Sequence, residues 1–251
     1  MKPTPYTTGP WRADAQHGGA PAALLGRSIE RLMEDDESLA RISVELIRPV
    51  PLEPLTVEAS RSAVSRRVSH IGGSLRVGHL EVARVMALVL RGAPLPPPRW
   101  EPDQTATEVP GPDKIERPPA FAVPHAPITY HRDAVEHRLT EGAFGVVGPA
   151  TDWIRLLEPL VEGEDTSSLC RLLAAVDFGS GISRIYGADD GVGMINADLT
   201  VAFARPPMGE WIRLASLTRV NDRGTGLATT EIGDENGYVG VATQSLLGIN
   251  F

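Results

Sequence analysis

Residues 42–49 read Ile-Ser-Val-Glu-Leu-Ile-Arg-Pro, an apolar strand-like segment that ends at an arginine and a proline. Residues 198–206, Asp-Leu-Thr-Val-Ala-Phe-Ala-Arg-Pro, repeat this layout in the second half of the chain. Alternating apolar residues are typical of a strand with one buried face, and proline is confined to strand ends because it cannot donate to the ladder. The repeated pattern predicts a duplicated sheet.

Three more strand-like segments follow each copy. They cover residues 55–59, 68–77 and 80–90 after the first copy, and residues 211–220, 226–232 and 238–247 after the second.

An apolar helix is predicted in front of each set of strands. The first opens at Gly18-Gly19-Ala20-Pro21, because proline is tolerated in the first helical turn, and continues to about Met33. The second has Thr166 or Ser167 as its N-cap and keeps helical apolar spacing to Val176. Each half therefore predicts one helix followed by four antiparallel strands, which is an α+β arrangement.

A proline-rich segment separates the two halves. Residues 92–127 hold half of the 22 prolines and show almost no apolar periodicity, which predicts a stiff, extended linker. We therefore expect an N-terminal unit at residues 1–91 and a C-terminal unit at residues 128–251. A chain of 251 residues is long enough for two such units.

Composition limits the class of protein. The single Cys170 excludes an internal disulfide framework, and no stretch approaches the roughly 20 apolar residues that cross a bilayer. With no signal-like start, we expect a cytoplasmic protein without a membrane partner. The net charge of −8 argues against nucleic acid as a partner.

Three arginines form a local basic cluster: Arg61, Arg66 and Arg67. They could hold the phosphates of a small ligand or be ordinary surface arginines.

A helix wrapped by a long antiparallel sheet, repeated in tandem, describes the double hotdog architecture. Three segments resemble bacterial acyl-CoA thioesterase II and its thioesterase-like relatives: Gln16-His17-Gly18-Gly19, residues 44–51 (Val-Glu-Leu-Ile-Arg-Pro-Val-Pro) and Ala242-Thr243-Gln244-Ser245. Their order and spacing carry the resemblance, which covers nearly the whole chain outside the linker. It implies hydrolysis of an acyl-CoA or another pantetheine thioester without a cofactor.

Polar residues that occur in only one copy are not required by the fold and are candidates for function. When the two copies are aligned on their Arg-Pro pairs, three polar residues of the second copy have no residue of the same kind in the first. Asp198 aligns with Arg41, Thr218 with about Arg61, and Gln244 with about Val85.

Thioester hydrolysis needs a water aimed at the carbonyl carbon, a base, and donors for the developing oxyanion. In the resembled family an aspartate, a threonine and a glutamine activate the water, and the resemblance assigns these roles to Asp198, Thr218 and Gln244. The threonine position is less well fixed: Thr218 matches with a one-residue gap, an ungapped alignment places Arg219 there, and Thr225 lies in the following turn. Asp198, Thr218 and Gln244 each also have a structural interpretation, as a turn, strand or edge residue.

Other residues complete the candidate site. The amides of Gly18 and Gly19 at a helix N-terminus could stabilise an oxyanion, and His17 could bind substrate or make a structural hydrogen bond. Asp177, near the end of the second helix, is the rival base.

No metal is expected. His125, His131 and His137 are spaced by six, which does not bring them to one helix face. No serine-hydrolase elbow or dinucleotide glycine pattern is present.

These patterns favour an acyl-CoA thioesterase that uses a carboxylate to activate water. A non-catalytic protein that binds acyl-CoA or another acyl ligand is the alternative. A hydratase is disfavoured, because neither helix start carries an Asp followed by a nearby His. Further association into a homo-oligomer stays open.

Overall fold

The computed structural model describes residues 1–100, 109–118 and 126–250. Two long helices, α1 (Gly19–Glu30) and α2 (Ser168–Val176), correspond to the two predicted helices. α1 ends three residues before the predicted Met33, and Ser167 is confirmed as the N-cap of α2, where its hydroxyl accepts the amide of Cys170 at 3.1 Å. Short helical turns complete the set: η1 (Pro5–Thr7), η2 (Pro112–Lys114), η3 (Tyr130–Ala134), α3 (Gly179–Ile182) and η4 (Ala188–Asp190).

The described strands form one antiparallel sheet in the order β2-β3-β4-β1-β8-β11-β10-β9-β6-β5, with β7 paired to β11. Their bounds are β1 (Ser38–Leu46), β2 (Thr56–Ala63), β3 (Val68–Val77), β4 (Leu80–Leu90), β5 (Val135–Glu141), β6 (Ala150–Leu156), β7 (Val192–Asn196), β8 (Asp198–Phe203), β9 (Ile212–Val220), β10 (Thr225–Asp234) and β11 (Gly237–Asn250). The eight strands predicted by the repeat are all present.

The strand order is symmetric about the β1–β8 pair. β4, β3 and β2 follow on one side of that pair, and β11, β10 and β9 follow on the other. Ser43 of β1 lies opposite Thr200 of β8, and the Thr200 hydroxyl donates to the Ser43 hydroxyl at 3.0 Å. The two strands that carry the repeated Arg-Pro pattern therefore join the halves into one continuous sheet.

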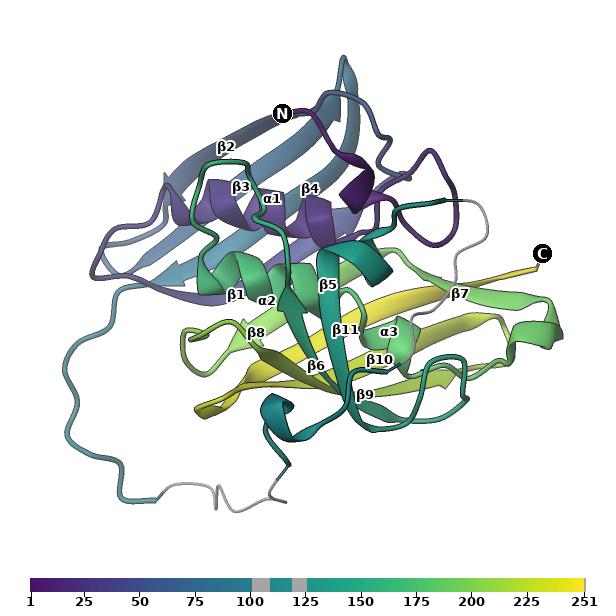
Figure 1. Ribbon diagram of the computed structural model, residues 1–251. Coiled ribbons are helices and arrows are strands. Elements are labelled where there is room, and N and C mark those ends of the chain that lie inside the picture. Colours follow the sequence, from purple (N-terminus) through teal and green to yellow (C-terminus); the bar gives the residue numbers. More distant parts are fainter. Residues whose placement is uncertain (101–108, 119–125, 251) are drawn as a thin grey trace.

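The C-terminal half is larger than four strands. β5 and β6 precede its helix, and β6 pairs with β9, so the sheet extends past the point at which the N-terminal half ends with β2. Figure 1 shows β2 at the far edge of the purple and blue half, with α1 and α2 lying across the sheet.

The two helices pack tightly against each other. A Cβ on Gly19 would lie 2.3 Å from the carbonyl oxygen of Ala174, and one on Gly26 would lie 2.2 Å from a methyl of Leu173. At Gly19 the close neighbour is backbone, so only hydrogen fits there and glycine permits the close approach of the helices. This packing brings the N-terminus of α1 beside the C-terminal end of α2.

Part of the predicted linker packs on the C-terminal half. The Trp153 indole donates to the Pro110 carbonyl at 3.0 Å, and Arg138 donates to the Ile115 carbonyl at 2.8 Å. Residues 101–108 and 119–125 of the predicted linker, including His125, lie outside the described residues.

Candidate active site

A buried carboxylate lies where the two helices meet. Asp177 follows the last residue of α2, and a carboxylate oxygen lies 3.0 Å from Nδ1 of His17, just before α1. A Cβ on Gly18 would lie only 2.7 Å from Asp177 Oδ2. The structure thus brings together His17, Gly18, Gly19 and Asp177, which come from opposite halves of the sequence.

The environment keeps Asp177 ionised. Burial alone would raise its pKa, but the adjacent His17, the Asn196 amide and the Gly19 N–H lower it below its ordinary value. Asn196 Nδ2 donates to Asp177 Oδ1 at 2.7 Å. Because Nδ1 of His17 faces a charged carboxylate, we place a hydrogen on Nδ1. A protonated Nδ1 cannot accept a hydrogen bond from the Gly19 N–H, which lies 3.1 Å away. The Gly19 N–H therefore donates to the Asp177 carboxylate instead.

Gln244 supports the same turn from the sheet. Its side chain is 1% exposed, and its amide Nε2 donates to the Asp177 carbonyl at 3.2 Å. Its Oε1 accepts the Ser180 N–H at 2.9 Å. The carboxamide therefore fixes the backbone on both sides of Phe178, at the junction of α2 and α3.

Thr218 lies on the same inner face of the sheet. Thr218 on β9 and Gln244 on β11 both pair with Ala228 on β10. The Thr218 hydroxyl lies 2.7 Å from that of Ser183, just after α3. The structure thus places Thr218 and Gln244 in one row below α3, as buried hydrogen-bonding groups.

Asp198 occupies a different position. It is the first residue of β8 and pairs with Glu45, whereas the buried Leu199 and Val201 alternate with it toward the inner face. A carboxylate oxygen of Asp198 accepts the backbone N–H of Ser245 at 2.6 Å. Asp198 on β8 thus contacts the residue next to Gln244, but its side chain lies on the outer face of the sheet, whereas Gln244 on β11 lies on the inner face.

A second buried Asp–His pair lies close to the first and was not predicted. His137 Nδ1 on β5 lies 2.5 Å from Asp152 Oδ2 on β6, and the two residues are 5% and 0% exposed. The rings of His17 and His137 both pack on Phe178, with centroid distances of 4.3 and 4.9 Å.

His131 completes this cluster from η3, a π-helical turn. Burial lowers its pKa from 6.5 to about 3, and the neighbouring His137 and His17 add to the shift. Single π-helical turns are frequent at functional sites, but they leave no recognisable pattern in one sequence.

Comparison with protein families assigns the chain to a family. A model of the acyl-CoA thioesterase N-terminal domain matches residues 7–90, and a model of the C-terminal domain matches residues 102–247. The chain belongs to the acyl-CoA thioesterase family. No curated protein matches it.

Solved structures confirm the double hotdog architecture of this thioesterase-family chain. A provisionally assigned thioesterase II of Thermobifida fusca is 15% identical, with a TM-score of 0.76 over 100% of this chain and 91% of that one. A hot dog fold protein of unknown function from Alicyclobacillus acidocaldarius is 17% identical, with a TM-score of 0.71 over 99% and 91%. A tesB protein of Mycobacterium avium subspecies paratuberculosis is 14% identical, with a TM-score of 0.67 over 97% and 91%.

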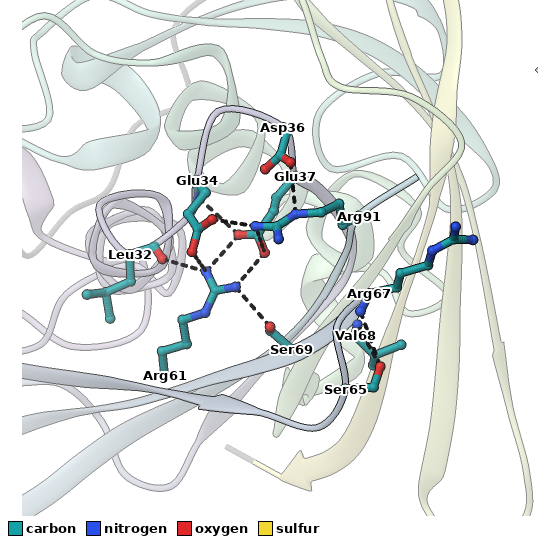
Figure 2. A network of polar contacts seen from close by, with 10 residues as sticks. All are labelled: Leu32, Glu34, Asp36, Glu37, Arg61, Ser65, Arg67, Val68, Ser69 and Arg91. Atoms are coloured by element: carbon teal, nitrogen blue, oxygen red, sulfur yellow. Dashed lines mark hydrogen bonds and ion pairs between the residues drawn. The ribbon is translucent and has the colours of Figure 1, made fainter. Parts of the chain in front are cut away.

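Two arginines of the predicted cluster, Arg61 and Arg67, have different surroundings. Figure 2 shows Arg61 surrounded by partners: Glu37 at 2.7 Å, the Ser69 hydroxyl at 2.9 Å and the Leu32 carbonyl at 3.1 Å. The hydrogen bonds from Arg61 lower the pKa of Glu37 to about 2. Arg61 therefore holds the segment after α1 against the sheet, whereas the side chain of Arg67 points away from this network (Figure 2).

Within residues 1–100, 109–118 and 126–250, no group of three or more His, Cys, Asp and Glu side chains is arranged to hold a metal ion. Across the same ranges, no helix combines the length and apolar character of a membrane span.

Proposed function

We propose that this chain hydrolyses acyl-CoA thioesters at the junction of α1 and α2, and that Asp177 is the carboxylate that activates water. Membership of the acyl-CoA thioesterase family supports the reaction class. The observation that carries the assignment of the base is the buried His17–Asp177 pair, 3.0 Å apart at the N-terminus of α1.

Asp177 has the properties that the step needs. Its lowered pKa keeps it charged at neutral pH, so it can accept a proton, and two carboxylate oxygens offer about four acceptor sites. His17 and Asn196 hold the carboxylate in one orientation. Fixed geometry of this kind contributes to general-base catalysis because the proton acceptor need not be ordered during the reaction.

The helix terminus supplies the electrostatic part. The N-terminal end of α1 carries a partial positive charge, which stabilises Asp177 in the resting state and an oxyanion during attack. Water adds to the thioester carbonyl as its proton passes to the carboxylate. Collapse of the tetrahedral intermediate then breaks the carbon–sulfur bond and releases the carboxylic acid and, once the proton returns, the free thiol of CoA.

Gln244 and Thr218 act as positioning residues in this proposal. Gln244 holds the backbone on both sides of Phe178, and Thr218 holds the end of α3 through Ser183. Loss of either is expected to misplace Asp177 without removing the base.

Asp198 is the second candidate base, because the family resemblance aligns it with the water-activating aspartate. A thiol-reactive dye assay with acyl-CoAs from acetyl to palmitoyl separates the two. Asp177→Asn should lower kcat/KM by on the order of 10²- to 10⁴-fold, whereas Asp198→Asn should lower it less than about tenfold. Asp222→Asn, in an exposed turn, is the matched control and should leave kcat/KM unchanged.

Two outcomes contradict the proposal. A larger loss in Asp198→Asn than in Asp177→Asn, at equal folded fraction, would transfer the role of base to Asp198. Calorimetric binding of acyl-CoA without any thiol release would make the chain a non-catalytic acyl-ligand binder.

A further inference from the structure

The two halves differ most at the outer ends of the sheet. When Arg48 and Arg205 are superimposed, Val57 on β2 corresponds to Leu214 on β9. Leu214 is covered by β6, where it pairs with Asp152. Among the described strands, β2 pairs with β3 alone and ends the sheet. The N-terminal half therefore lacks the strand that fills this place in the C-terminal half.

An open hollow of about 420 Å³ lies at that place, between α1 and β2. Its apolar lining comes from Leu24 and Leu32 on the helix side and from Leu55 and Val57 on the strand side. The volume falls within the roughly 300–1,000 Å³ of small-molecule sites. The space is thus large enough for part of an alkyl chain and offers it an apolar surface.

The charge at the hollow is positive. Arg27 and Arg31 are the charged side chains among the described residues that line it. Arg27 makes three hydrogen bonds to Glu164, at 2.8, 2.6 and 2.6 Å, whereas the nearest Arg31 nitrogen lies 3.4 Å from the same carboxylate. The Arg31 side chain is 62% exposed. Arg31 therefore makes the longer contact to Glu164 and keeps most of its guanidinium exposed, which leaves it able to pair with the carboxylate of a ligand.

We propose that this hollow binds a fatty acid, with its carboxylate at Arg31 and Arg27 and its alkyl chain along Leu24, Leu55 and Val57. An apolar lining with a cationic rim fits an anionic amphiphile better than a neutral lipid. The lining side chains contain no carboxylate or imidazole among the described residues, so the site binds without hydrolysing. The proposal is independent of the thioesterase proposal, because binding needs no turnover.

Methyl-labelled NMR with decanoate, 1-decanol and acetate tests the location and the chemistry together. Decanoate should shift the methyl signals of Leu24, Leu55 and Val57, and acetate should not. Decanol should bind at least about fivefold more weakly than decanoate, which corresponds to about 1 kcal/mol for one exposed ion pair. Arg31→Glu should weaken decanoate binding by a similar factor or more, while Arg66→Glu, an equal charge change in an exposed turn, should not.

A second variant keeps the test independent of the arginine. Val57→Asp places a negative charge in the lining and should abolish the decanoate shifts while the melting temperature shows a folded chain. Decanoate shifts confined to Ile182, beside the candidate active site, would overturn the proposal, as would equal affinities for decanoate in wild type and Arg31→Glu.

Discussion

His131 should make the folded chain sensitive to mild acid. Its pKa falls from 6.5 to about 3 in the folded state, chiefly because of burial. Below pH 6.5 an unfolded chain takes up a proton on this side chain and the folded chain does not. The unfolded state is therefore favoured progressively as the pH falls from about 6.5 toward 3, and the stability is fully present only above 6.5.

The size of the effect follows from the two pKa values. At pH 5 the unfolded imidazole is almost fully charged and the folded one is neutral, which costs at most about 2 kcal/mol at 1.36 kcal/mol per pH unit. Asp177 does not titrate between pH 7.5 and pH 5, so it does not contribute to the change in stability over this range. Its folded pKa is lowered from 3.8, so its contribution is lost only as the pH falls below about 4.

Urea unfolding at pH 7.5 and pH 5 measures this effect in wild type, His131→Gln and His79→Gln. The loss of unfolding free energy between the two pH values should be smaller by about 2 kcal/mol in His131→Gln than in wild type. His79 is exposed in a turn, so His79→Gln should keep the wild-type loss. An equal loss in wild type and His131→Gln would refute the idea that the folded chain holds His131 in its neutral form.

Two glycine substitutions, one of them with a matched control, test the packing that builds the site, and a substitution of Glu37 tests the network around Arg61. Gly19→Ala places a Cβ 2.3 Å from the Ala174 carbonyl and should cost about 1–3 kcal/mol in thermal or urea unfolding; unchanged stability would contradict the close helix contact. Gly179→Ala, whose Cβ would lie 2.6 Å from a buried hydroxyl, should lower thioesterase activity, whereas Gly181→Ala, with open space around it, should not; equal activities would argue against this packing. Glu37→Gln weakens a charge-assisted hydrogen bond and should cost about 1–3 kcal/mol in urea unfolding, and no change in stability would show that the network in Figure 2 contributes little.

The duplicated strands were predictable because each carries a local pattern. Alternation and the Arg-Pro ends predict β1 and β8 directly, and glycine turns predict the hairpin of β3 and β4. β5 and β6 were missed because their buried faces carry His137 and Asp152. Polar residues at core positions break the apolar periodicity, and a single sequence does not reveal that they are paired inside the protein.

The site was predictable in part. The sequence singled out His17, Gly18, Gly19 and Asp177 separately, but their contact depends on how two distant helices pack. Alignment of the two repeats favoured Asp198. That alignment compares positions along the sequence, and it does not show which face of the sheet a side chain occupies. Pairing with Glu45 places Asp198 away from Gln244, and that information exists only in the assembled sheet.

A crystal structure with a bound acyl-CoA analogue, in which a methylene replaces the thioester sulfur, would show which carboxylate lies beside the substrate carbonyl. We expect the carbonyl carbon to lie at the N-terminus of α1, with one water between it and the Asp177 carboxylate. A carbonyl beside Asp198, with Asp177 remote from the bound water, would contradict it.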